Sequence, residues 1–352
     1  METSLTSYRE QLIEKLVAFL WGQWSALGVA GHARSDDNRI IDPEALLLFS
    51  TVIARHDARL FDEVLDWLQE NASRISLQRL GTMVKEERLG DMAVLAAMAE
   101  YLTKHTTHKT WKLVIRKAES AGSITKGTVE RLFPGVPLTG EPDPIFLQRS
   151  LERGKIDLRG MSRRPRTDQP ATFLFKLRSL FGRQARAEVV AWLLANDRGH
   201  PAAIARHTGY FRRTVQIVLN DLSESGHVRA IRSGREKDFL IDPDEWRFLM
   251  TWKPADTFPR WVTWAPVFRF LESVLETLSQ PGIDERSERF KAVQLREVLS
   301  AAPPSMKECG ISFDLRSSVE LQGSALVEAV LTDLDQLMGE LVGTKWHGFA
   351  IR

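Results

Sequence analysis

Polar side chains that can recognise nucleic acid recur along one stretch of this chain, residues 211–224. Arg212, Arg213, Gln216 and Asn220 occupy positions outside its apolar pattern. An arginine can form two parallel hydrogen bonds with the edge of guanine, and an amide side chain can do the same with adenine. The spacing of these residues therefore predicts direct contact with base edges and phosphates.

Other residues nearby are expected to contact a phosphate backbone. Tyr210 and Thr214 flank the first of these arginines and carry hydroxyl groups that can bond phosphate oxygens. A predicted hairpin further along the chain adds four polar residues, Arg232, Ser233, Arg235 and Lys237. An earlier basic stretch adds three arginines suited to a DNA backbone or a minor groove, Arg163, Arg164 and Arg166.

Two helices joined by a tight turn must position these side chains. The first follows Gly199, has Pro201 near its first helical position and ends at Thr208-Gly209. The second, over 211–224, carries apolar residues at helical spacing that must be buried, namely Val215, Val218, Leu219 and Leu222. Residues 228–241 then read as two short strands around a turn at Ser233-Gly234.

This arrangement resembles a winged helix-turn-helix of the bacterial MarR and ArsR type. The resemblance rests on I-A-x-x-T-G at 204–209 and on T-V-x-x-x-L-x-x-L-x-x-x-G-x-V at 214–228. It covers about a fifth of the chain. The resemblance implies sequence-specific binding of double-stranded DNA by a transcriptional regulator, more often a repressor, that works as a homodimer. Helix 211–224 would enter the major groove, and the wing at 228–241 would contact the neighbouring backbone.

The charge of the chain is concentrated around this motif. The formal net charge is only +2, but residues 149–237 contain 19 Lys and Arg against 8 Asp and Glu. A basic block therefore lies between two acidic flanks, as expected of a module that binds duplex DNA. A solvated basic surface without a ligand is the alternative interpretation.

No pattern in the sequence indicates an enzyme, a metal site or a cofactor. His105-x-x-His108 could place two imidazoles on one helix face, but no cysteine or carboxylate set completes a site. Cys309 is the single cysteine and has no histidine near it in sequence. Phosphate-binding loops and nucleophile motifs are not found either. We therefore expect a protein that is not an enzyme.

The expected fold is mainly α, with a winged helix-turn-helix domain between helical N- and C-terminal domains. We predict a helical domain over 1–132, a basic linker rich in Pro and Gly over 133–170, the winged helix over 171–250 and a helical domain over 251–352. The last domain is expected to serve dimerisation or to hold an effector or partner. Its two apolar stripes suit the intrachain core better than an interface: Leu271, Val274, Leu275 and Leu278, then Val327, Val330, Leu331 and Leu334.

A possible internal repeat involves the first domain. E-V-x-x-W-L-x-x-N occurs at Glu63–Asn71 and again at Glu188–Asn196, and the pattern of 214–228 has an echo at 110–124. These echoes predict a degenerate winged-helix-like unit over 60–130, although similar amphipathic helices can also match by chance.

The sequence as a whole predicts a cellular location and leaves a second function open. One cysteine, no signal peptide and no long apolar run predict a cytoplasmic protein without a membrane span. The alternative function is a protein-interaction module, such as an antitoxin-like partner protein, whose acidic helical flanks hold another protein. That protein would use its winged helix for docking or autoregulation.

Overall fold

The computed structural model of the chain describes residues 4–31, 38–120, 129–233, 236–253, 257–302, 306–311, 313 and 321–342. This part of the chain is mainly α-helical, as predicted, and contains two small two-stranded sheets. Among its helices, none combines the length and apolar character needed to cross a membrane.

The N-terminal third of the chain is helical where it was expected to be. It contains α1 (Leu5–Ala26), α2 (Pro43–Ile53), α3 (Ala58–Asn71), α4 (Leu77–Glu87), α5 (Met92–His105) and α6 (Lys112–Ser120). Three short 3₁₀ turns join them, at Ala54–His56, Ala72–Arg74 and Lys109–Trp111. Helix α2 begins at an acidic cap, because the Asp42 carboxylate accepts hydrogen bonds from the N–H groups of Glu44 and Ala45.

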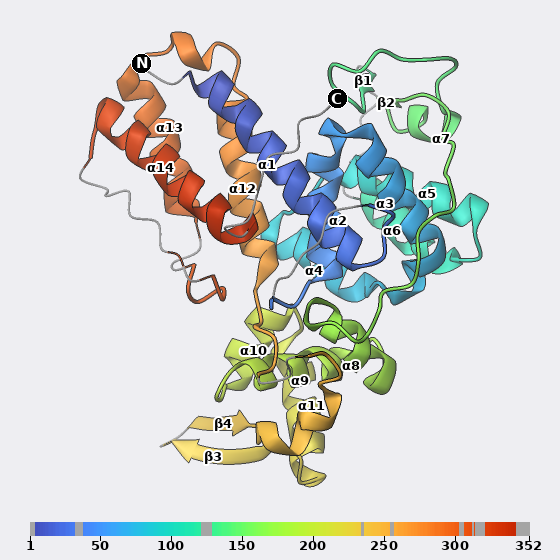
Figure 1. Cartoon of the computed structure of the whole chain (residues 1–352), viewed down its shortest axis with the longest axis vertical. Coiled ribbons are helices and arrows are strands. Elements are labelled where there is room, and N and C mark those ends of the chain that lie inside the picture. The colour runs from blue at the N-terminus through green and yellow to red at the C-terminus, as the bar shows by residue number, and fades with distance from the viewer. Residues whose placement is uncertain are drawn as a thin grey trace.

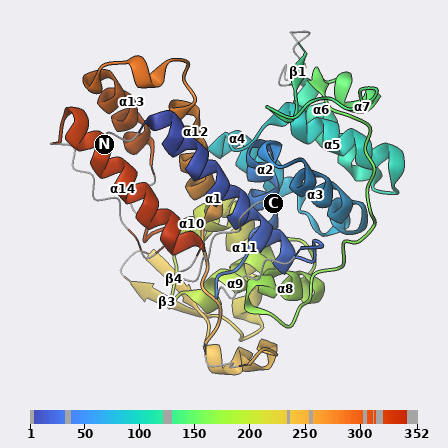
Figure 2. The ribbon, with the colours of Figure 1, turned by 45° about the horizontal axis from the view of Figure 1, so that its top comes forward.

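The C-terminal helices do not form a separate domain. They are α12 (Trp264–Leu278), α13 (Glu288–Ala301) and α14 (Gly323–Val342), with a 3₁₀ turn at Ile283–Glu285. Helix α1 packs against both α12 and α14, and α2 packs against α12 (Figures 1 and 2). The rings of Phe49 and Phe268 stack with centroids 4.4 Å apart, and the Tyr8 hydroxyl donates to the carbonyl of Leu331 at 3.1 Å. Both ends of the chain therefore build one hydrophobic core.

This shared core, called here the helical body (α1–α6 and α12–α14), corrects the expected division into two flanking domains. It also accounts for the apolar stripes of the C-terminal helices. Every residue of the two stripes named above is buried inside the helical body. These stripes are intrachain core, so they cannot supply the contact surface of a homodimer without opening the fold.

The predicted linker is a packed segment. Glu130–Arg131 (β1) pairs in parallel with Leu151–Glu152 (β2), and α7 (Pro144–Leu147) lies between them. Arg153 pairs with Asp62 at 2.7 Å and lies over the aromatic rings around that site. The chain then follows α3, where the N–H groups of Gly160 and Ser162 donate to Asp66. Ion pairs and backbone hydrogen bonds thus hold this segment on the helical body.

Residues 171–250 form a second hydrophobic cluster, called here the head, at one end of the molecule (Figure 1). It comprises α8 (Phe173–Phe181), α9 (Ala185–Ala195), α10 (Pro201–Thr208), α11 (Arg212–Glu224), β3 (Arg229–Ser233) and β4 (Glu236–Leu240). Short 3₁₀ helices at Pro170–Thr172 and Pro243–Leu249 border it. Strands β3 and β4 pair as an antiparallel hairpin.

The predicted internal repeat is seen in one helix only. In both α3 and α9 the asparagine of the motif donates to the tryptophan carbonyl four residues earlier, Asn71 to Trp67 and Asn196 to Trp192. The neighbourhoods differ, however, because α9 packs on α10 and α11 whereas α6 packs chiefly on α5. The described strand that follows α6, β1, pairs in parallel with β2 and forms no hairpin. The prediction of a second winged-helix-like unit over 60–130 is therefore wrong for the described part of that range. Residues 121–128 lie outside the described residues.

Candidate nucleic-acid interface

Local sequence determines the turn that joins α10 to α11. The imidazole of His200 accepts a hydrogen bond from the N–H of Ala202, and Pro201 occupies the first turn of α10. Gly209 ends the helix in the left-handed conformation, with φ at +71°, and its N–H donates to the carbonyl of Ala205. This turn brings Arg212 to the start of α11.

Helix α11 is amphipathic, and its polar face is open to solvent. Its four predicted core residues, Val215, Val218, Leu219 and Leu222, are buried against α9 and α10. On the other face Arg212, Arg213 and Asn220 are exposed, and the half-buried Gln216 donates to the Asn220 side chain at 3.1 Å. The row of residues predicted to contact bases is therefore assembled on one accessible surface.

Two further side chains lie beside this row, and one of them, Thr214, is a predicted phosphate contact. Ile217 is 53% exposed within the row, and Thr214 beside it is half-buried. At the far end Asp221 forms an ion pair with Arg186 at 2.8 Å, which neutralises an acidic group next to the polar row. Arg198, in the turn between α9 and α10, is exposed and adds a further cation to the head.

The β3–β4 hairpin places like charges opposite each other. Arg232 and Lys237 are direct cross-strand partners, and both are exposed. Like charges in this arrangement destabilise a hairpin unless an anion lies between or near them. Lys237 also lies 4.9 Å from the centroid of the Phe239 ring. Arg235 and the Ser233 side chain, both predicted contacts, lie outside the described residues.

A backbone bridge joins the hairpin to the turn before α10. Gly199 and Phe239 exchange hydrogen bonds at 2.9 and 3.0 Å, which gives the hairpin a third, one-residue strand. Glycine is needed at this position because a Cβ atom there would lie 2.3 Å from the Trp192 ring. The hairpin is therefore fixed relative to α9 and α11, although its sequence gave no sign of this bridge.

One predicted phosphate contact, Tyr210, needs correction. Tyr210 is only 6% exposed and packs in the core of the head, where burial and the charge of Glu188 raise the pKa of its hydroxyl. It cannot reach a phosphate without leaving that core. Its position at the end of the helix-turn-helix pattern marks a packing residue.

The arginine-rich arm is attached to the helical body and is not a free extension. The backbone of Arg163 donates to the carbonyl of Gly28 and accepts from Asn71, although its side chain and that of Arg164 are exposed. Arg166 is exposed and forms an ion pair with Asp168 at 2.6 Å. The arm therefore presents its side chains from a fixed backbone, on the segment that runs along α3.

Sequence reasoning missed a buried ionic cluster that joins the head to the helical body. Arg79 of α4 donates to the carbonyl of Thr208 at 2.8 Å and to the carboxylates of Asp42 and Glu44. Burial alone would raise the pKa of Asp42, but the guanidinium of Arg79 outweighs it and holds the pKa below its usual value. The last residue of α10 is therefore fixed by a charged group of the body.

The second arginine of this cluster belongs to the head. Arg178 of α8 pairs with Glu44 at 2.7 Å and with Glu188 at 2.7 Å, and all three are buried. The sequence did carry a signal, because each residue lies among apolar neighbours: Glu44 in P-E-A-L-L-L-F, Arg178 in F-K-L-R-S-L-F and Glu188 in A-E-V-V-A-W-L-L. A charge in such a run needs a buried partner.

The residues considered for metal or nucleophilic chemistry have other roles. His108 bonds the carbonyl of Gln69 at 2.9 Å, and His105 stacks on Tyr101. In the described ranges no three His, Cys, Asp or Glu residues gather in a way that could hold a metal ion. Burial and the nearby charges of Glu308 and Glu87 raise the pKa of the Cys309 thiol to about 11, so this thiol stays protonated near neutral pH.

Comparison with known proteins adds no relative to this picture. Tested against models of protein families, against curated proteins and against solved structures, the chain matches none.

Proposed function

We propose that the head is a winged helix-turn-helix and that the protein binds double-stranded DNA in a sequence-specific manner as a transcriptional regulator, acting as a repressor. Helix α11 is the recognition helix, and the β3–β4 hairpin is the wing. The observation that supports this most is the exposed polar row of α11, because its opposite face is buried and its position is fixed by α9 and α10.

The dimensions and chemistry of the row suit duplex DNA. A major groove about 12 Å wide admits one helix, and the first turns of that helix reach the bases. Arg212 and Arg213 occupy the first turn of α11, and Gln216 follows one turn later. We assign guanine contacts to these arginines and an adenine contact to Gln216.

The wing supports the same function through its charge. The unfavourable pairing of Arg232 with Lys237 would be relieved by a phosphate backbone, which supplies the missing negative charge. Arg198 is exposed in the turn between α9 and α10. The next residue, Gly199, is bridged to Phe239 of the wing, so the Arg198 backbone lies close to the wing.

One recognition helix covers too few bases for specificity in a genome, so we propose that two copies bind a pseudo-palindromic site. Because the C-terminal stripes are buried inside the helical body, the two copies must meet through other surfaces. Light scattering of the full chain with and without its duplex tests this stoichiometry.

The function itself is tested by selecting duplexes from a random library with the full chain, over a series of salt concentrations. We expect an enriched sequence with guanine at the positions facing α11. Arg213→Ala should weaken binding to that sequence by about 1–3 kcal/mol and relax the preference at one guanine. Lys237→Ala should weaken binding to all sequences and reduce the slope of log K against log salt by about 0.9.

Arg289→Ala provides the matched control, since this arginine is exposed on α13 of the helical body. It should leave both the preference and the salt slope unchanged. Enrichment of no sequence, with a steep salt slope, would contradict specific recognition. Failure to retain any duplex at low salt would contradict DNA binding and favour a head that docks on protein.

A further inference from the structure

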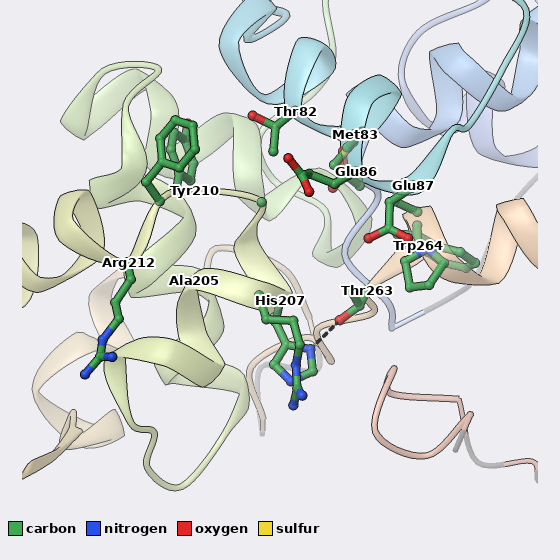
Figure 3. Close-up of a pocket in the computed structure, with 16 residues that line it drawn as sticks. Thr82, Met83, Glu86, Glu87, Ala205, His207, Tyr210, Arg212, Thr263 and Trp264 are labelled. Atoms are coloured by element: carbon green, nitrogen blue, oxygen red, sulfur yellow. Dashed lines mark hydrogen bonds between the residues drawn. The ribbon is translucent and has the colours of Figure 1, made fainter. Parts of the chain in front are cut away.

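A cavity of about 410 Å³ lies where the head meets the helical body. The end of α4 and the start of α12 line it from the body, and the end of α10 and the start of α11 line it from the head (Figure 3). Its volume lies within the range of small-molecule sites, roughly 300–1,000 Å³. Apart from Arg212 at its edge, duplex recognition does not use it.

The two sides of this cavity carry opposite charges. Glu86 and Glu87 come from the last turn of α4, whereas Arg206 comes from α10 and Arg212 from α11. Among the described residues no ion pair joins these carboxylates to these guanidinium groups, and Glu86 has only a 3.6 Å contact with its exposed neighbour Lys85. Both signs of charge are therefore available to a ligand.

Glu87 is the carboxylate whose surroundings most favour an added cation. It is half-buried, and burial together with the charge of Glu86 raises its pKa. A ligand ammonium beside it would favour the ionised carboxylate and restore the charge balance at the end of α4.

Apolar side chains line the space between the charged groups. Trp264 and Met83 are buried, and the indole of Trp264 is fixed by a hydrogen bond from its Nε1 to the carbonyl of Ile40 at 2.8 Å. Phe211, also part of the lining, leaves 63% of its surface exposed. An apolar ligand group would be covered by Trp264 and Met83 and would cover part of Phe211.

We propose that this cavity binds a small zwitterion with an apolar side group, of the chemical class of an amino acid, and that this ligand regulates duplex binding. Its ammonium contacts Glu86 and Glu87, its apolar group lies on Trp264, and its carboxylate contacts Arg206. A ligand with a single charge would make only one of these two charge-assisted contacts and would therefore bind with a less favourable free energy.

The proposed regulation of duplex binding rests on the proposed function, and three observations support it. Arg212 lies at the edge of the cavity and also in the first turn of α11; Figure 3 shows its guanidinium directed away from Glu86 and Glu87. His207 of the head bonds Thr263 of the body at 2.9 Å within the cavity lining (Figure 3). Arg79 ties α4 to the end of α10.

The ligand carboxylate attracts Arg212 from the DNA side. The ligand and the duplex therefore weaken each other, and by thermodynamic linkage each must lower the affinity of the other by the same factor.

The site is tested by isothermal titration calorimetry of the full chain with the standard L-amino acids as probes, each at millimolar concentration. The best binder is then compared with its decarboxylated amine and with its deaminated acid. We expect each single-charge analogue to bind at least about tenfold more weakly. Glu87→Gln and Arg206→Gln should each weaken the amino acid to a similar degree.

Glu328→Gln and Arg289→Gln are the controls, because both residues are exposed on the helical body and line no part of the cavity. Binding of no amino acid, or binding that neither cavity variant weakens, would overturn the site. Equal binding of the amine or of the acid alone would overturn the zwitterion.

Regulation is tested separately, with a duplex obtained by selection. The saturating amino acid should lower duplex affinity, and Glu87→Gln should raise the amino acid concentration needed for this effect by at least about tenfold while leaving duplex affinity without ligand unchanged. An unchanged duplex affinity at saturation would overturn the regulation. If the chain binds no duplex, the proposed function fails, whereas the calorimetric result for the cavity still holds.

Discussion

Buried charged residues with apolar neighbours in sequence fix the position of the head on the helical body. Arg79 and Arg178 are buried with three carboxylates, those of Asp42, Glu44 and Glu188. Such a cluster adds little net stability compared with a well-packed apolar group, but removal of one partner leaves uncompensated charge in a region of low dielectric constant. Its role is to specify one position of the head on the body.

Replacement of Arg79 by methionine should therefore be strongly destabilising. Arg79→Met keeps most of the side-chain volume but leaves Asp42 and Glu44 without their common partner. We expect the free energy of unfolding, measured with urea, to fall by about 3–5 kcal/mol. Lys85→Met on the same helix, where the side chain is 81% exposed, should change it by less than about 0.5 kcal/mol. A loss below about 1 kcal/mol for Arg79→Met would contradict this role.

Glu272 makes the stability of the body depend on pH. Both of its carboxylate oxygens accept the N–H of Gly90 at 3.2 Å, and burial raises its pKa from 4.5 to about 7. The unfolded chain ionises this group near pH 4.5, so the folded state is free of a penalty below that pH. The penalty grows as the pH rises towards 7 and is complete above it.

Glu272→Gln removes this penalty and keeps an oxygen for Gly90. Relative to the wild type, the variant should gain up to about 3 kcal/mol in free energy of unfolding between pH 4 and pH 8. Glu276→Gln, exposed on the same helix and also paired with Arg269, is the control and should not reproduce this gain. Parallel stability curves for the wild type and Glu272→Gln would show that burial of Glu272 carries no such cost.

At the scale of elements, α11 packs on α9, and the hairpin is bridged to the turn that follows α9, so the two are held together. Gly199 is the point of closest approach, where the bridge to Phe239 passes the Trp192 ring. The hairpin therefore keeps its angle to the polar row of α11, and both parts of the candidate interface can face one ligand.

Two glycine-to-alanine substitutions should have opposite effects. Gly199→Ala places a methyl group 2.3 Å from Trp192, so we expect a loss of about 1–3 kcal/mol in free energy of unfolding. Gly22→Ala in α1 meets no atom within 4 Å, and the higher helix propensity of alanine should add about 0.5–1 kcal/mol. Thermal unfolding followed by circular dichroism measures both. Equal shifts in melting temperature would contradict the close approach at Gly199.

At the scale of the whole molecule, the first and the last described helices belong to the same body, and the head lies between its two parts in the sequence. Asp284 accepts a hydrogen bond from the N–H of Leu5 at 2.6 Å, so the C-terminal part caps the first helix of the chain. The body cannot be complete until its last helices are made, since α12 covers apolar residues of α1 and α2.

A chain that ends at residue 250 should therefore fail to form a stable body. Phe19 and Phe49 would lose the rings of Trp264 and Phe268 and would become exposed. We expect strong binding of an apolar dye and loss of a cooperative unfolding transition, measured by fluorescence and circular dichroism. Tyr8→Phe, which removes the hydroxyl that bonds the Leu331 carbonyl and the Asp335 carboxylate, should cost about 1–2 kcal/mol and remain folded. A cooperative transition in the truncated chain would indicate separate domains.

The sequence by itself determined the helices, the hairpin and the polar row of α11, because these follow from local propensity, capping and the periodicity of apolar residues. The buried stripe of Val215, Val218, Leu219 and Leu222 follows from helical spacing alone. Only the tertiary structure decided that both ends of the chain share one core, that Tyr210 is buried and that Arg79 fixes the end of α10. Those features depend on contacts between residues far apart in sequence, and periodicity within one element carries no information about its partner.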